Sequence, residues 1–277
     1  MPPLTEQAVQ FPQTLRTLVG VVTSAESHDQ RARPAVVLLN AGLLHRVGPN
    51  RLYVRIAREV ARRGFASLRF DLSGIGDSPS RNDSVPLRTT ALHDVQDAFD
   101  YLAATEAITS FLVIGLCSGA DLAFRAALAD RRVVGAVLID GLPYRTMRSQ
   151  LHDQWQRVLC ASSDDGGRRL VAAIWCRIRK LRTPKPCGAP RRDRRDVPGK
   201  HEAEASLHLL VRRGVKLLMI YTSGRGYSYE RQFADLFPSL PPSAVQVEYF
   251  RDAQHTFSLL VNQDRLVRTI EGWVAGF

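Results

Sequence analysis

Cys117 lies between two glycines at the point where a buried apolar stretch gives way to a helical pattern, in the sequence "VIGLCSGADLAF". Gly115 and Gly119 stand two positions to either side of it, and a sharp strand-to-helix turn needs small residues there. A turn centred on Ser118 would put a leucine at one of those positions, where its side chain would clash. The spacing therefore predicts Cys117 as a nucleophile and directs the backbone N–H of Ser118 into an oxyanion hole.

A thiol at this position has a chemical rationale. A helix N-terminus lowers the pKa of a cysteine, and a nearby histidine can take its proton. A thiolate attacks thioesters and activated esters well and forms an acyl-thioester intermediate, so the pattern favours acyl transfer or thioester cleavage over amide hydrolysis. The alternative is that Cys117 is a buried cysteine that acts only as a small apolar residue.

The base is predicted to be His255, in "YFRDAQHTF", because it follows the last predicted strand and precedes the C-terminal helix. The group that orients it is predicted to be Asp140, at the end of "VLIDG", with Glu230 as the alternative acid. Glu230 is the first carboxylate after the strand "VKLLMIY". Asp252 is closer in sequence to His255, but we expect it to cap or brace its own loop.

A second oxyanion donor is expected from the loop "NAGLLHR", which follows the apolar stretch "AVVLLN". Gly42 and Leu43 are both candidates. His45, Arg46 and Arg51 come next and could hold a carboxylate or phosphate of the substrate. Their alternative role is surface solvation and pairing at the start of a helix.

Short apolar runs alternate with amphipathic helical patterns along most of the chain. This alternation is typical of an α/β fold with a mostly parallel central sheet and helices on both of its faces. Strands are expected at Leu18–Ala25, Ala35–Asn40, in "FASLRFD", in "SFLVIGLCSG", and at Val133–Gly141, Gly214–Gly224 and Ala244–Phe250. Helices are expected at Arg51–Gly64 and Thr89–Thr105, in "GADLAFRAALAD" and in the C-terminal "LVNQDRLVRTIEGWVAGF".

The alternation stops after the strand at Val133–Gly141. Residues 143–210 contain helical patterns and a basic, Pro-rich run but no convincing buried strand. We interpret this stretch as a helical, basic cap inserted into a core made of residues 1–142 and 211–277.

Charge is concentrated in the expected cap. The chain has a net charge of +11, and Arg177–Lys200 alone carries ten Lys or Arg against two Asp. Such a run is typical of a solvated surface, and the alternative is a docking surface for an acidic partner. A nucleic-acid partner is not expected, because the run lacks interleaved aromatic residues and a recognisable motif.

Composition limits the remaining possibilities. Neither a secretory signal nor an apolar run of about 18 residues is present, so no membrane span is expected. No C-x-x-C pair occurs, so neither a metal site nor a disulfide framework is expected, and a reducing cytoplasm fits best. No cofactor is expected. The cysteines are Cys117, Cys160, Cys176 and Cys187.

Four stretches, "NAGLLHRVGPNR", "LRFDLSGIGDS", "GLCSGADLAF" and "RDAQHTF", resemble in order the landmarks of the α/β-hydrolase-fold superfamily. Cysteine elbows similar to this one occur in exosortase-system-associated and dienelactone-hydrolase-like hydrolases, in thioesterases and in carrier-protein aminoacyltransferases. The resemblance implies an α/β-hydrolase fold, and it implies that Asp71 and the glycines after it brace a loop beside the active site.

These observations predict a cysteine-dependent acyl hydrolase or acyltransferase that forms an acyl-enzyme on Cys117. Its substrate would be a small acyl ester or thioester, which an acidic acyl or peptidyl carrier protein could present. Water or a second substrate would accept the acyl group, and the sequence leaves both open. The alternative is a catalytically idle hydrolase fold that serves as a binding or scaffold protein.

Overall fold

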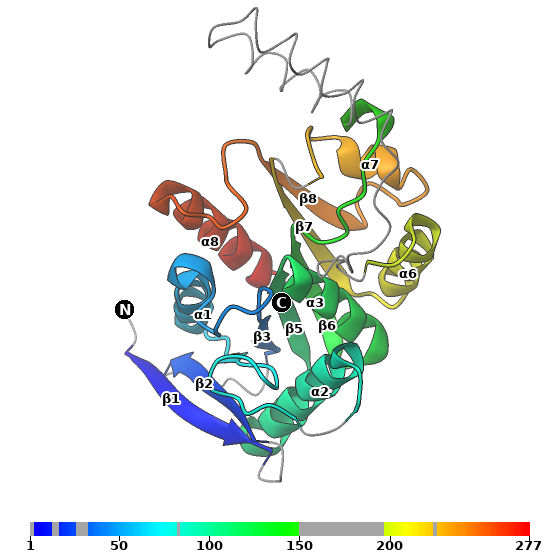
Figure 1. The fold of residues 1–277 in the computed structure, drawn as a ribbon. Coiled ribbons are helices and arrows are strands. Elements are labelled where there is room, and N and C mark those ends of the chain that lie inside the picture. The colour runs from blue at the N-terminus through cyan, green and yellow to red at the C-terminus, as the bar shows by residue number, and fades with distance from the viewer. Residues whose placement is uncertain (1–2, 13–16, 26–32, 82–83, 150–196, 224–225) are drawn as a thin grey trace, which may run out of the picture.

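The computed structural model describes residues 3–12, 17–25, 33–81, 84–149, 197–223 and 226–277. Within these ranges the strands form one eight-stranded sheet in the order β1-β2-β4-β3-β5-β6-β7-β8. Strand β2 is antiparallel to both of its neighbours, whereas the strands from β4 to β8 are mutually parallel. The expected α/β fold with a mostly parallel sheet is therefore confirmed (Figure 1).

The strands are β1 Leu4–Phe11, β2 Leu18–Ala25, β3 Ala35–Leu39, β4 Ser67–Phe70, β5 Phe111–Leu116, β6 Val133–Ile139, β7 Lys216–Thr222 and β8 Val245–Phe250. The helices are the 3-10 turn η2 Pro49–Arg51, α1 Leu52–Arg62, α2 Leu87–Glu106, α3 Ser118–Ala129, α6 Lys200–Arg212, α7 Gln232–Leu236 and α8 Leu260–Val274.

Helices cover both faces of the sheet, with α1 and α8 on one face and α2, α3 and α6 on the other (Figure 1). Strand β5 lies in the middle, and all of its residues are buried. Successive side chains of a strand point to opposite faces, so Val113 packs in the cluster with α2 and α3 while Ile114 packs in the cluster with α1 and α8. Burial on both faces explains why this strand is a continuous apolar run.

Two elements lack a strong sequence signal. Strand β1 is an edge strand whose residues are mostly exposed, so its sequence "LTEQAVQF" carries little apolar periodicity. Helix α7 spans only Gln232–Leu236, too short for a helical pattern to stand out. Both elements were absent from the sequence-based prediction for this reason.

The expected boundary of the cap at residue 210 falls inside helix α6, Lys200–Arg212. Ala203, Leu207 and Leu210 of this helix are fully buried in the cluster that holds α2 and α3, so the core resumes before residue 211. These residues recur at intervals of four and three, which is the spacing of a helix face that packs on a core. Residues 150–196, with most of the basic run, lie outside the described residues, and the cap as a unit remains a prediction.

None of the helices in the described part of the chain is both long enough and apolar enough to cross a membrane.

Candidate active site

The predicted site residues lie at the carboxyl ends of parallel strands. Gly42 follows β3, Cys117 follows β5, Asp140 follows β6 and His255 follows β8. Carboxyl ends of parallel strands lie at one edge of a sheet, where ligands of open α/β folds bind. The order of strands thus brings together four residues that are far apart in the sequence.

Cys117 occupies a strained turn between β5 and α3. Its backbone has φ 61° and ψ −120°, a positive φ that residues other than glycine rarely adopt. A Cβ on Gly115 would lie 2.0 Å from the carbonyl oxygen of Gly119, and a Cβ on Gly119 would lie 2.5 Å from that of Asn40. Both glycines are therefore required sterically, because backbone atoms leave no room for a side chain on either side of the turn.

Replacing Gly115 or Gly119 with alanine is expected to lower the free energy of unfolding by about 3 kcal/mol or more, because backbone would have to move. Gly272→Ala in α8 is the matched control, since a Cβ there meets no atom within 4 Å. That variant should be neutral or stabilising by up to about 1 kcal/mol, the helix preference of alanine over glycine. Urea unfolding measures all three, and equal effects would contradict the steric argument.

His255 and Asp140 form a direct contact. His255 donates from Nδ1 to Oδ2 of Asp140 at 2.5 Å. Asp140 is buried and also accepts hydrogen bonds from Thr222, from the backbone N–H to Oδ1 at 2.7 Å and from the hydroxyl to Oδ2 at 2.7 Å. These bonds hold the carboxylate in one orientation and thereby hold the imidazole ring.

Glu230, the alternative acid, is exposed in the segment between β7 and α7. There it lines a pocket of about 850 Å³ together with Phe233, Phe237 and residues of β8. The carboxylate that reaches His255 thus comes from the end of β6, the strand that follows β5 in the chain, at the position of Asp140.

The pKa of His255 is raised from its ordinary 6.5 to about 9. Burial of the ring alone would lower the pKa, but hydrogen bonds to Asp140 and Cys117 and the negative charge of both partners outweigh it. The imidazole therefore contacts Cys117 as well as Asp140, and its protonated form is favoured between them.

This raised pKa predicts a pH dependence of stability. A base whose folded pKa exceeds its unfolded pKa stabilises the fold fully below the unfolded value, here 6.5, and loses that contribution as the pH rises through about 9. The difference in unfolding free energy between the wild type and His255→Gln should therefore be larger at pH 6 than at pH 10. Urea titrations measure it, with His93→Gln on the exposed side of α2 as the control. A difference that does not change with pH would contradict the shift.

The two predicted parts of the oxyanion hole also meet. Ser118 is the first residue of α3, and Gly42 lies in the loop after β3 with φ +63°. The backbone N–H of Gly42 donates to the hydroxyl of Ser118 at 2.8 Å. The side chain of Leu43, the other candidate, is 83% exposed.

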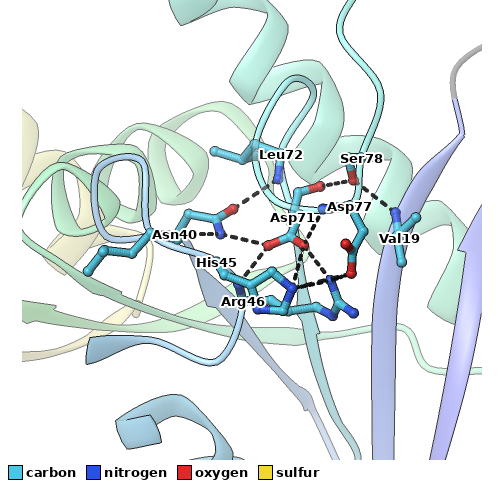
Figure 2. A network of polar contacts seen from close by, with 9 residues as sticks. Val19, Asn40, His45, Arg46, Asp71, Leu72, Asp77 and Ser78 are labelled. Carbon is cyan, nitrogen blue, oxygen red and sulfur yellow. Dashed lines mark hydrogen bonds and ion pairs between the residues drawn. The ribbon is translucent and has the colours of Figure 1, made fainter. Parts of the chain in front are cut away.

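A buried polar network holds the ends of this loop (Figure 2). Asp71 is fully buried and accepts from the backbone N–H of Arg46 at 2.6 Å, from the Asn40 side chain at 3.2 Å and from the Arg46 guanidinium. Asn40 in turn accepts from the backbone N–H of Leu72 at 2.9 Å and donates to the carbonyl of Leu44 at 2.8 Å. Asp71 therefore anchors the loop that carries Gly42.

The three residues predicted to bind an anionic group of the substrate, His45, Arg46 and Arg51, differ in their burial and in their partners. Arg46 is mostly buried and pairs with Asp71 and, at 2.8 Å, with Asp77. His45 lies 3.3 Å from Asp77. Arg51 is exposed just before α1. The Arg46 guanidinium is thus already paired with carboxylates, which leaves it ill suited to hold an anionic substrate.

His45, Asp71 and Asp77 lie close enough to one another to offer ligands to a metal ion. The Arg46 guanidinium occupies the space among them, however, with Nη1 2.8 Å from the His45 ring and 2.8 Å from Asp77. The positive charge that these groups need is supplied by the protein itself.

Arg46→Met is expected to lower the free energy of unfolding by about 3–5 kcal/mol, because it leaves the Asp71 carboxylate buried without its charge partner. Arg51→Met is the matched control and should stay within about 0.5 kcal/mol, since Arg51 is exposed. Chemical denaturation measures both. A variant at Arg46 that keeps full stability but raises the KM for an acidic substrate would instead assign Arg46 to substrate binding.

Two residues that position the site were not identified from the sequence. Thr222 ends β7 and holds Asp140, and its only signal is a hydroxyl directly after an apolar strand. Tyr53 of α1 is fully buried, donates to the Leu39 carbonyl at 2.8 Å and accepts from the Leu116 N–H at 3.0 Å. It thereby ties the end of β3 to the residue before Cys117, and its sequence position shows only an amphipathic helix.

One family model matches part of the chain. The family described as serine aminopeptidase, S33 matches residues 31–159, which include the loop that carries Gly42 and the turn at Cys117. No curated protein matches the sequence.

Solved structures match the whole fold. An α/β hydrolase, GrgF, from Penicillium sp. sh18 is 16% identical with a TM-score of 0.59, covering 98% of each chain. A thioesterase domain from the curacin biosynthetic pathway is 14% identical with a TM-score of 0.59, covering 98% of this chain and 99% of that one. An esterase of Pyrococcus furiosus is 14% identical with a TM-score of 0.60, covering 99% and 93%. At these identities the likeness concerns the fold alone, which is the α/β-hydrolase fold.

Proposed function

We propose that this protein is a cysteine-dependent acyl hydrolase or acyltransferase that acts on esters or thioesters. The observation that carries the proposal is that Cys117, in the strained turn between β5 and α3, contacts His255, which in turn contacts Asp140. A nucleophile, a base in contact with it and a carboxylate that orients the base are the parts that nucleophilic catalysis needs. The hydrolase fold supports the same reaction class.

In the proposed acylation step, His255 takes the proton of the Cys117 thiol and the sulfur attacks the substrate carbonyl carbon. Because Nδ1 of His255 is bonded to Asp140, the proton moves through Nε2. The carbonyl oxygen becomes an oxyanion, which accepts hydrogen bonds from the N–H of Ser118 and of Gly42 or Leu43. Collapse of this intermediate breaks the bond to the leaving alkoxide or thiolate, which takes the proton from His255.

Deacylation repeats these steps in the opposite sense. A water molecule, or an acceptor thiol, amine or hydroxyl, loses its proton to His255 and attacks the acyl-thioester carbon. The Cys117 sulfur then leaves and recovers the proton. Water as acceptor gives hydrolysis and a second substrate gives acyl transfer. All the reacting groups are side chains and backbone amides, so the mechanism requires no cofactor.

Esters and thioesters are favoured over amides for a chemical reason. In the intermediate formed from an amide, the Cys117 thiolate would be expelled more easily than the amine, so the reaction would revert. Exposed apolar side chains near the site support an acyl group that is itself apolar. Leu43 lies on the oxyanion loop, and Leu259 and Leu260, both more than half exposed, follow His255 at the start of α8.

Intact-protein mass after incubation with a panel of acyl thioesters tests the proposal. A covalent adduct on the wild type with the mass of one acyl group, mapped to Cys117 by peptide analysis, is the expected result. Cys117→Ala should give no such adduct, which separates the active site from Cys160, Cys176 and Cys187. A wild-type protein that forms no adduct with any ester or thioester would favour the idle scaffold.

The substrate is further proposed to arrive on an acidic acyl or peptidyl carrier protein, in the cytoplasm. The support is the charge of Arg177–Lys200, ten Lys or Arg against two Asp, next to the chain segment that resumes the core at α6. Charge steering would raise the association rate at low salt. Reversing the charges of Arg191, Arg192, Arg194 and Arg195 should raise the KM for the carrier-bound thioester and leave that of a small analogue unchanged. Equal effects on both substrates would contradict the proposal that a carrier protein docks on this segment.

A further inference from the structure

We propose that the side-chain hydroxyl of Ser118, and not only its backbone N–H, is part of the oxyanion hole, as a positioning group that holds the Gly42 amide over the nucleophile turn. The inference rests on the proposed acyl chemistry at Cys117. It starts from one contact between residues 76 positions apart, the hydrogen bond from the Gly42 N–H to Ser118 Oγ at 2.8 Å.

The loop needs such a tether at Gly42. Asn40 and Arg46 hold its two ends through Asp71. Between these anchors Gly42 is exposed, has φ +63° and would place a Cβ in open space. The turn hydrogen bond from the Leu44 N–H to the Ala41 carbonyl at 3.2 Å holds the Ala41–Gly42 peptide from one side, and glycine has no side chain that would hold it by packing. The Ser118 hydroxyl supplies the acceptor for the N–H on the other side of that peptide.

The place of Ser118 makes this contact relevant to catalysis. Ser118 follows Cys117 directly and begins α3, a helix of 12 residues whose N-terminus favours negative charge. An acceptor attached to the residue after the nucleophile keeps the Gly42 N–H aimed at the region where the oxyanion develops. The hydroxyl therefore stands in for the oxyanion in the resting enzyme.

The hydrogen bond from the Gly42 N–H to Ser118 Oγ also makes the Gly42 amide bind the transition state more strongly than the substrate. Ser118 Oγ and a substrate carbonyl are both neutral acceptors, so a bound substrate gains little by displacing the hydroxyl from Gly42. Hydrogen bonds to a charged acceptor are about twice as strong as neutral ones, so the oxyanion takes the amide from Ser118. An interaction that strengthens only in the transition state raises kcat and leaves KM nearly unchanged.

Ser118→Ala and Ser118→Thr, each compared with the wild type, test the proposal. A chromogenic thioester measures acylation, which forms an oxyanion, and iodoacetamide measures alkylation of Cys117, which forms none. Ser118→Ala should lower kcat by about tenfold to a hundredfold with KM changed by less than about threefold, because the donor is misplaced and not removed. Its alkylation rate should match the wild type, and Ser118→Thr, which keeps the hydroxyl, should recover most of the acylation rate.

Amide hydrogen exchange gives a second readout that does not depend on turnover. The Gly42 amide should exchange faster in Ser118→Ala than in the wild type or in Ser118→Thr. Unchanged acylation and unchanged Gly42 exchange in Ser118→Ala would overturn the inference while the Cys117 adduct still forms. Equal losses of acylation and alkylation would also overturn it, since they would place the effect on the thiolate. A wild type that forms no acyl adduct would remove both the proposed function and this inference.

Discussion

Replacing Cys117 with alanine is expected to lower turnover of esters and thioesters by at least about 10⁴-fold, because the acyl-enzyme can no longer form. The fold should persist, because alanine is smaller than cysteine and the two glycines that shape the turn remain. Steady-state kinetics measure the loss, and peptide mapping after iodoacetamide treatment should show that labelling at residue 117 disappears.

Cys117→Ser is the control for the kind of nucleophile. Serine fits the same turn, but its hydroxyl is far harder to deprotonate than a thiol, so it depends more on the His255–Asp140 pair. We expect this variant to retain part of the activity toward esters and to lose the reaction with iodoacetamide. A fully active Cys117→Ala would show that the nucleophile lies elsewhere.

Asp140→Asn is expected to lower kcat by up to about 10⁴-fold, the loss found when the acid of a catalytic triad becomes an amide. Thr222 donates two hydrogen bonds to the carboxylate and His255 donates a third, so a carboxamide at position 140 must offer an N–H to one of these donors. The imidazole then loses its charge partner and its preferred tautomer.

The same variant should change the ionisation of the site. With Asp140 gone, burial continues to lower the pKa of His255 and only Cys117 still raises it, so the pKa should fall from about 9. The thiolate–imidazolium pair then becomes less populated at neutral pH. Alkylation of Cys117 by iodoacetamide at pH 7 should slow relative to the wild type, and the rate against pH measures the shift.

Glu230→Gln is the matched control for Asp140→Asn, because both replace a carboxylate that the sequence offered as the triad acid. Glu230 is exposed in the segment before α7, so its variant should keep activity within about twofold. Loss of activity at Glu230 together with full activity at Asp140 would reverse the roles of the two carboxylates.

Local spacing was sufficient to predict the framework of the protein. The turn at Cys117 depends on contacts between residues that are close in sequence, since Gly115 lies against the backbone of Gly119. Such contacts can be inferred from the residue types a few positions apart. The alternation of apolar runs and amphipathic helices predicted the parallel sheet for a similar reason, because buried strands and helices each impose a repeat of a few residues. An exposed edge strand such as β1 imposes no such repeat and escaped prediction.

The sequence could not decide which acid contacts His255 or which arginine is buried, because these contacts join segments that are far apart in the chain. Asp140 and His255 are 115 residues apart, and their contact depends on β6 and β8 lying on either side of β7, whose Thr222 fixes the carboxylate. Arg46 has the same charge as Arg51, yet only the folded chain places it against Asp71 and away from solvent.

The sequence by itself determined the fold class, the cysteine turn and a short set of possible partners for Cys117, because these follow from local sterics and from the repeat of buried positions. Only the tertiary structure decided which carboxylate reaches His255, that Arg46 is paired with Asp71, and that the Gly42 N–H meets the hydroxyl of Ser118. The physical reason is that hydrogen bonds are directional and short, so their partners depend on where loops from different strands meet.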